Sequence, residues 1–323
     1  MDKYPLIVGI DVSKDTFNVH FDNTDLKLAN NLRGFRLFLK SVPTGSVLAM
    51  EATGNYHYKL AAFMHGKGYK IMVLNPYKVN HWIKANSDKA NDDKHAAKNI
   101  TDYARNRMEK NVPFWSPMSP ELMRSRAIVS FLNRFTKIDV SCSNMNHAMG
   151  LTLDKKSDLL TLMPDMKAIC REQSAKLKKE LCDIVKKLYP QQFRLLLTIP
   201  GIGSKTAAVF CVLARGFTDF ANEKRLTSFV GLALKYHESG TTIKSKRKTA
   251  KTGNSYLRGL LFNCARAAIK SKKSPCGEFY RKLLSKGKAE RLAKVAVMHK
   301  LVKIAFGVVN SGEPCRGGKK HFV

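Results

Sequence analysis

The sequence predicts an amino-terminal α/β domain, a long helical connector resembling a coiled coil, and a mainly α carboxy-terminal domain. Residues 5–110 alternate short apolar strand segments with helical stretches. Residues 118–190 contain no strand-like run and carry helical patterning, and the chain from about residue 193 onward is mainly helical and strongly basic. We place the domains at residues 1–112, 113–192 and 193–323, a division that suits a chain of 323 residues.

The first domain is expected to contain a partly parallel sheet. Short apolar or alternating runs predict the strands, and a Gly-Lys-Gly turn after residue 65 ends the first helix. A strand, a helix and a second strand in this order imply a parallel crossover. The expected elements are strands at residues 6–10, 16–21, 46–51 and 70–74, a tight turn at 12–15, and helices at 58–65 and over most of 79–108.

The connector is expected to form two long helices that make an antiparallel or dimerising arm. Leu177, Leu181, Ile184 and Leu188 are spaced by four, three and four residues, which is typical of the apolar seam of a coiled coil. Pro164 is expected to interrupt this helical region.

The carboxy-terminal domain is expected to be helical, with a turn at Ile199–Gly203 between two helices. It also holds most of the excess positive charge, because residues 239–323 include 21 basic and three acidic side chains. The whole chain has 57 Lys and Arg against 25 Asp and Glu, a net charge of +32, and such a field attracts polyanions. Nucleic acid is therefore the expected partner.

The sequence argues against a membrane-spanning protein, a secreted protein, and a fold stabilised by zinc or disulfides. No apolar run reaches the length that spans a membrane, and the amino terminus leads into a short strand and a carboxylate, unlike a signal peptide. The seven cysteines contain no CxxC pair, so neither a zinc site nor a disulfide framework is indicated. A cytoplasmic, nucleoid-associated protein is expected.

Two acids mark the candidate site of the first domain. Asp11 and Glu51 come at or just after the ends of two predicted strands, where open α/β sheets bind ligands. Two such oxygen ligands suit Mg²⁺, which can stabilise the attacking and leaving oxygens of a phosphodiester. The alternative is that Asp11 is a turn residue and Glu51 a charge at a helix start. Asp93 with Asp92 opens a predicted helix, where acids complement the helix dipole without any metal.

Several segments resemble, in the same order and spacing, the RuvC-like DEDD transposases of insertion-sequence family 110, whose relatives include the Piv-type DNA invertases. The resemblance covers nearly the whole chain. Its segments are Ile7–Lys14, Glu51–Tyr56, Val73–Pro76, Asp93–Ile100, Ile199–Gly203, Phe229–Leu232, Glu238–Gly240 and Lys251–Arg258.

The resemblance implies an RNase H/RuvC-like first domain in which Asp11, Glu51 and Asp93 bind Mg²⁺. Family members usually carry two aspartates three residues apart on the helix that begins near Asp93, and Ala96 occupies the position of the second one. The chain therefore either works with three acids or is catalytically inactive.

The resemblance also gives Ser239 a role. Composition alone makes it an ordinary loop serine, although Gly240 would let the backbone approach a phosphate. By resemblance Ser239 is the catalytic serine, which attacks a DNA phosphodiester to give a covalent phosphoserine–DNA intermediate and a free 3′ hydroxyl. The family's site is composite, with acids and serine from different subunits. His237, two residues away, could contact Ser239, but nothing else supports a Ser-His-acid triad.

Basic residues of the last domain are expected to contact phosphates, with a solvated charged face as the alternative. The turn at Gly201–Gly203 could offer backbone amides to a phosphate or could simply be a packing turn. Tyr256, Phe262 and Phe279 are expected in the core rather than in base stacking. The candidate nucleic-acid-binding residues are Lys205, Lys244, Lys246, Arg247, Lys248, Lys251 and Arg258.

The resemblance further implies partners: donor and target DNA, a structured guide (bridge) RNA that specifies both by base pairing, and further copies of the chain in a dimer or dimer of dimers. The leading hypothesis is an RNA-guided DNA transposase or recombinase. The alternatives are a RuvC-like structure-specific nuclease that uses water, and a catalytically inactive nucleic-acid-binding scaffold.

Overall fold

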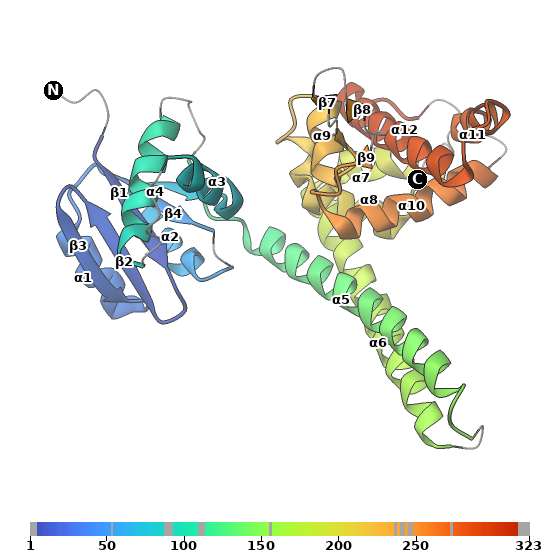
Figure 1. Cartoon of the computed structure of the whole chain (residues 1–323), viewed down its shortest axis with the longest axis horizontal. Coiled ribbons are helices and arrows are strands. Elements are labelled where there is room, and N and C mark those ends of the chain that lie inside the picture. The colour runs from blue at the N-terminus through green and yellow to red at the C-terminus, as the bar shows by residue number, and fades with distance from the viewer. Residues whose placement is uncertain are drawn as a thin grey trace. The chain divides into compact units, whose positions relative to one another are not determined.

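A computed structural model describes residues 5–52, 54–86, 93–108, 114–154, 157–235, 238–239, 243–244, 248–271 and 274–315. Within these ranges, the side chains of residues 93–95, 235, 238–239, 243–244 and 248 are outside the description. The chain divides into two compact units, residues 1–118 and 119–323 (Figure 1).

The first unit is built on a five-stranded mixed sheet with the order β3-β2-β1-β4-β5. β1 pairs antiparallel with β2, and β2 with β3, whereas β1, β4 and β5 are mutually parallel neighbours. The predicted strands and the parallel crossover are confirmed. β3 was not predicted, because it is an edge strand whose side chains are mostly exposed and polar. The strands are β1 (Ile7–Val12), β2 (Thr16–Phe21), β3 (Thr24–Ala29), β4 (Val47–Glu51) and β5 (Lys70–Leu74).

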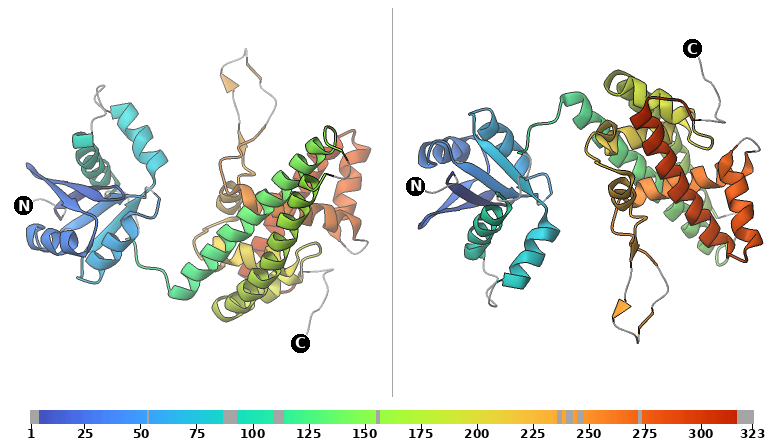
Figure 2. Two further views of the ribbon diagram at one scale, coloured as in Figure 1. Left: turned by 90° about the horizontal axis from the view of Figure 1, so that it is seen from below. Right: turned by 90° about the horizontal axis from the view of Figure 1, so that it is seen from above.

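Helices cover both faces of this sheet, as Figure 2 shows. One face buries Phe35 and Phe38 of α1 together with Leu60 and Met64 of α2. The other face packs against α3 and α4 through a separate apolar cluster that includes Val79. The helices are α1 (Leu32–Ser41), which the sequence did not predict, α2 (His57–His65), α3 (Pro76–Asn86) and α4 (Asp93–Met108).

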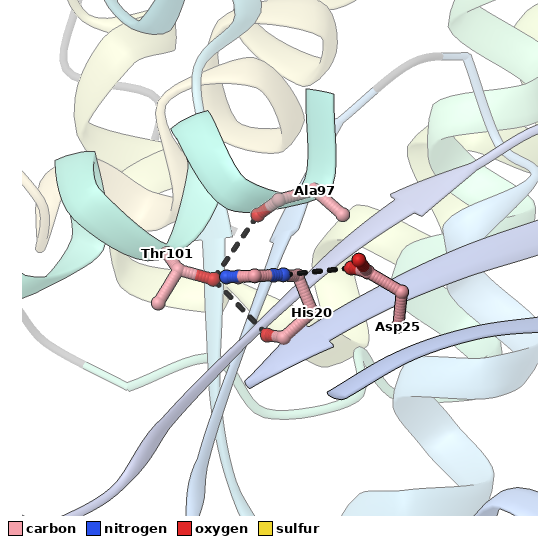
Figure 3. A network of polar contacts seen from close by, with 4 residues as sticks. All are labelled: His20, Asp25, Ala97 and Thr101. Carbon is pink, nitrogen blue, oxygen red and sulfur yellow. Dashed lines mark hydrogen bonds and ion pairs between the residues drawn. The ribbon is translucent and has the colours of Figure 1, made fainter. Parts of the chain in front are cut away.

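Helix α4 lies directly on β1 because Gly9 has no side chain. A Cβ at Gly9 would stand 2.1 Å from the carbonyl oxygen of Ala97 and 2.3 Å from the Thr101 hydroxyl. The Thr101 hydroxyl in turn donates to the carbonyl oxygens of Ala97 and of His20 on β2, each 3.1 Å away (Figure 3). The His20 ring also bonds Asp25 of β3, so the contact at Gly9 extends across three strands.

Replacing Gly9 should therefore separate the helix from the sheet. We expect Gly9→Val to lower the free energy of unfolding by about 3 kcal/mol, because the overlap includes the backbone oxygen of Ala97 and the backbone nitrogen of Thr101, which cannot move aside individually. Urea denaturation followed by circular dichroism measures the effect. Gly66→Ala is the matched control, since a Cβ there makes only ordinary contacts of 3.4 Å and longer. Equal stabilities of the two variants would show that α4 is not held against β1 in this way.

The second unit begins with two long helices, α5 (Pro120–Met149) and α6 (Leu159–Leu188), which lie side by side and antiparallel (Figures 1 and 2). Arg124 near the start of α5 pairs with Glu180 near the end of α6, with 2.7 Å between Nε and Oε1. Leu181 of the predicted seam is fully buried. The expected interruption at Pro164 is wrong: the residue lies in the second turn of α6, where the lost hydrogen bond affects only the helix end.

Helix α8, whose residues 206–212 are all buried, packs against α5, α6, α7 and α10. The predicted turn at Ile199–Gly203 joins α7 to α8, as expected. Among the described residues, no helix has both the length and the apolar character needed to cross a membrane. The elements are α7 (Pro190–Leu197), α8 (Ser204–Leu213), the 3₁₀ helix η1 (Arg215–Phe217), α9 (Glu223–Val230), α10 (Ser255–Lys270), α11 (Pro275–Ser285) and α12 (Glu290–Ser311).

Two pairs of short antiparallel strands lie between α9 and α10. β6 (Leu234–Lys235) pairs with β9 (Lys248–Thr249), and β7 (Glu238–Ser239) pairs with β8 (Ile243–Lys244). The second unit is therefore mainly helical, with these strands as its β structure among the described residues.

Candidate active site

Asp11 and Glu51 lie next to each other at the carboxyl ends of the adjacent strands β1 and β4. β1 and β4 are parallel and in register up to Ile10 and Met50, so the following residues, Asp11 and Glu51, are neighbours across the two strands. Side chains alternate along a strand, and Gly9 and Ala49 face α4. Asp11 and Glu51 therefore share the face of the sheet that α4 covers. Both are half-buried.

The chemistry of this pair fits a hard divalent cation, which prefers carboxylate oxygens. Two acids on adjacent parallel strands can direct oxygens to one point beyond the strand ends. Among the side chains that the structure describes, no group of three or more acidic, histidine or cysteine residues is assembled to hold a metal. The side chain of Asp93, the third expected ligand, is outside that set.

The start of α4 belongs to the same region of the unit. Asp93 is the first residue of α4, one helical turn before Ala97. Ala97 packs on Gly9, and Gly9 precedes Asp11 by two residues on β1. Ala96, at the position where the resemblance implies a fourth acid, is half-buried.

Asn30 connects the two loops that follow the acid-bearing strands. Its side-chain amide donates to the carbonyl oxygen of Ser13, 2.8 Å away, and to that of Tyr56, 3.4 Å away. Ser13 follows β1 and Tyr56 follows β4, so one amide ties together the chain beyond Asp11 and beyond Glu51. The role of Asn30 was not predicted from the sequence, because no sequence pattern around a turn asparagine indicates a contact with a residue 26 positions away.

His57 at the start of α2 was also missed. It is 8% exposed, and burial lowers the pKa of its imidazole. Its Nδ1 is buried without a hydrogen-bond partner among the described residues. The ring is therefore neutral at pH 7, and it lies six residues beyond Glu51.

Ser239 lies in a short strand, whereas composition alone predicted a loop. It is the second residue of β7 and pairs with Ile243 of β8, while Glu238 pairs with Lys244. The backbone thus brings the start of the basic run alongside the serine, on the neighbouring strand. His237, Lys246 and Arg247 lie outside the described residues, as do the side chains of Ser239, Lys244 and Lys248.

Ser239 lies within the segment of residues 232–251, called here the Ser239 segment. The two ends of this segment, its base, are held together by backbone contacts between the chain before β6 and the chain after β9. The amide of Lys251 donates to Gly231 and that of Asn254 to Phe229, at 3.2 and 2.9 Å. Gly253 lies so close to Gly231 that a Cβ on it would be 2.2 Å from the Gly231 nitrogen. Lys251 has a φ of 57°, a strained value for a residue with a side chain, and strain of this kind clusters at functional sites.

Arg258 supports the same base. Its Nη1 donates to the carbonyl oxygen of Val230 at 3.0 Å and lies 3.5 Å from that of Gly253. Arg258, which the sequence predicted to bind nucleic acid, therefore has an internal structural role. Lys251, in contrast, is exposed.

Lys205 near the start of α8 is half-buried. Its ammonium lies 5.8 Å from the centre of the Tyr256 ring, and burial, followed by the nearby charge of Lys178, lowers its pKa. The preceding turn is a packing turn at Gly201, which has a φ of 91° and contacts the backbone of α10 at Cys264. A Cβ on Gly203 would meet no atom within 4 Å, so that part of the turn is open.

The expectation that three aromatic residues are core residues is correct for Tyr256, which is 8% exposed. It is wrong for Phe262 and Phe279, which are half-buried and line separate cavities. Helical spacing alone could not separate these cases, because residues that line a cavity follow the same spacing as residues that fill a core.

Comparison with known proteins adds two family matches. The sequence model of the "Transposase IS116/IS110/IS902 family" matches residues 193–281, and a DEDD "Transposase" model matches residues 8–124. The chain is 26% identical over 319 residues to the pilin gene-inverting protein of Moraxella lacunata, covering 95% of this chain and 96% of that protein. It is 24% identical over 345 residues to the transposase for insertion sequence element IS1111A of Coxiella burnetii, covering 97% and 92%.

Proposed function

Because the chain belongs to the IS110 family of transposases, we propose that it is a DNA transposase or recombinase that cuts and rejoins strands with a serine nucleophile. The observation that carries the proposal is the placement of Asp11 and Glu51 side by side at the carboxyl ends of β1 and β4. The two similar proteins described above are named for gene inversion and for transposition of an insertion sequence.

The acids provide the electrostatic part of the site. Asp11, Glu51 and Asp93 would hold Mg²⁺, which when bound supplies positive charge to the oxygens of a scissile phosphodiester. Asn30 holds the loops after Asp11 and Glu51 in a fixed arrangement before DNA binds. We assign the amino-terminal region, residues 1–112, as a RuvC-like carboxylate domain on this basis.

Ser239 provides the nucleophile. Its Oγ forms a bond to phosphorus while the bond from phosphorus to the 3′ oxygen breaks, and the serine proton ends on the released 3′ hydroxyl. The product is a phosphoserine–DNA linkage, and the free 3′ hydroxyl of a partner strand later attacks it and restores the serine. The basic run that begins at Lys244 on β8, the strand paired with the one that carries Ser239, would supply positive charge for this step.

The strongly basic carboxy-terminal region, residues 193–323, binds the nucleic-acid backbone in this proposal. Lys244, Lys246, Arg247, Lys248 and Lys251 form its densest run, with Lys205 and Arg258 as further contacts. Residues 113–192 form an arm that joins copies into a dimer or dimer of dimers, so that acids and serine from different subunits form one site. A structured guide RNA supplies sequence specificity by pairing, and the protein recognises its shape and phosphates.

Ala96 favours one alternative, a nucleic-acid-binding scaffold without catalysis, because one anionic ligand is missing from the expected set. A nuclease that uses water in place of Ser239 is the second alternative. The two alternatives share the prediction that no covalent protein–DNA adduct forms.

A trapping experiment tests the proposal. The full chain, its co-purified RNA and end-labelled cognate DNA are incubated with Mg²⁺ and then denatured, and adducts are mapped by mass spectrometry. We expect a DNA adduct on the peptide that contains Ser239, with a larger yield from Ala96→Asp, which restores an acid on α4. Free cleaved DNA without adduct would support the water-using nuclease. Intact DNA with both proteins would support the scaffold.

A further inference from the structure

A cavity of about 310 Å³ lies against the base of the Ser239 segment. It is lined by Leu232, Thr249 and Lys251 of that segment and by residues of α10 and α12. Its size is within the range of about 300–1,000 Å³ that is usual for small-ligand pockets. None of the residues assigned above to acid or nucleophile chemistry lines it.

The floor of the cavity is apolar and includes an aromatic ring. Leu232 and Met298 are 1% and 2% exposed, so they form a fixed surface continuous with the core. Phe262 is only half-buried, and its uncovered part faces the cavity. A flat apolar group can therefore lie on the uncovered part of the Phe262 ring, with buried apolar side chains around it.

Apart from Gly259 and Val295, the other lining residues are cationic or carry hydroxyls. Lys251, Arg258 and Arg291 contribute positive charge, and the pocket has no acidic lining residue. Within the described part of the chain, no ion pair joins these three cations to an acid. Glu290, the acid next to Arg291, is already bonded by the Lys294 ammonium at 2.6 Å and by the Tyr280 hydroxyl. The positive charge of the pocket is thus available to an anionic ligand.

We propose that this cavity binds one unpaired nucleotide, with the base against Phe262 and the phosphate at the cations. A flat apolar face attached to an anion is the chemistry that an aromatic floor with a cationic rim recognises. A paired duplex could satisfy the cations only, because its bases remain stacked inside the helix. The inference rests on the proposed function only in that nucleic acid is the substrate, and DNA and RNA strands carry the same feature.

Gly259 offers a direct way to close the cavity. It lines the pocket on α10, and a Cβ built on it meets no atom within 4 Å. Leucine at this position would fill the pocket without displacing the core, and it is a better helix former than glycine. Gly307 on α12 is the matched control, because it is exposed, also meets no atom within 4 Å, and lies outside this pocket.

The test compares binding of the full chain to a fully paired DNA duplex and to the same duplex with one extra, unpaired 2-aminopurine nucleotide. A second pair of duplexes carries a ribonucleotide at that position. We expect the wild-type chain to bind the bulged duplex about tenfold more tightly, equivalent to about 1.4 kcal/mol, and to quench the probe. Gly259→Leu should lose this preference and the quenching but keep its affinity for the paired duplex. Gly307→Leu should keep the preference for the bulged duplex, the quenching and the affinity for the paired duplex. The deoxy and ribo probes show which strand the pocket accepts.

Gly259→Leu with an unchanged preference would overturn the inference, and so would an equal loss of affinity for both duplexes. Ser239→Ala separates this result from the proposed function. If that variant keeps the preference while no protein forms an adduct, the nucleotide pocket stands and the serine chemistry is wrong. If adducts form as expected but no chain prefers the bulge, the serine chemistry stands and the pocket assignment is wrong.

Discussion

Ser239→Ala should abolish the covalent DNA adduct and reduce strand exchange by about 10⁴-fold or more, which is the scale of losing a nucleophile. The change removes one oxygen from a residue in a two-residue strand, and the β7–β8 pairing uses backbone groups only. The fold and the affinity for DNA should therefore remain. Denaturing gel electrophoresis measures adducts, and a plasmid inversion or integration assay measures exchange.

Ser285→Ala is the matched control for this prediction. Ser285 is an exposed serine at the end of α11, and its hydroxyl donates to the carbonyl oxygen of Lys282 in its own helix. The control should match the wild-type chain in both assays. Normal strand exchange by Ser239→Ala, measured in the Ala96→Asp background as well, would show that water or another group attacks the phosphate.

Asp11→Asn and Glu51→Gln should each reduce adduct formation by about 10²–10³-fold, the effect of removing one preorganised electrostatic group. Each change keeps the shape of the side chain and removes its charge. Because the two acids are neighbours across parallel strands, we expect them to act as one unit. The double variant should then be far less impaired than the product of the single effects predicts.

Isothermal titration with Mg²⁺ gives a second readout that does not depend on activity, and binding should weaken in both single variants. Asp22→Asn is the control, since Asp22 is an exposed turn residue with a φ of 49° that asparagine tolerates. If Asp11→Asn binds Mg²⁺ and forms adducts like Asp22→Asn, the carboxylate pair is not the cation site. If adduct formation by the double variant instead falls by the product of the two single effects, Asp11 and Glu51 have separate roles.

The strands that carry the acids could be predicted because burial leaves a clear pattern. Residues 7–10 and 47–50 are all buried, and uninterrupted apolar runs that end in an acid are unusual in a surface loop. β3 alternates between exposed and half-buried positions at the sheet edge, so its sequence resembles that of a polar loop. The start of α1 is capped by Asn31, whose side-chain oxygen accepts a hydrogen bond from the backbone amide of Gly34, 3.0 Å away.

The site could be predicted only in part, for a similar reason. Asp11 and Glu51 stand at strand ends, and strand ends are visible in a sequence. The role given to Ser239 came from resemblance, because a serine in a polar segment has no local feature that distinguishes a nucleophile. The contacts of Asn30 and of Arg258 depend on which distant backbone lies beside them, and no periodicity carries that information.

The contact between Gly9 and α4 also governs which changes of length the chain can accept during evolution. Helical residues are related by 3.6 positions per turn, so one residue inserted between Asp93 and Ala97 would rotate the first turn by roughly 100° relative to the docked part. Asp93 would then be rotated away from the position that the proposed cation site requires, although every original amino acid remained. Homologous chains should therefore conserve the spacing from Asp93 to Ala97 more strictly than the identity of the residues between them.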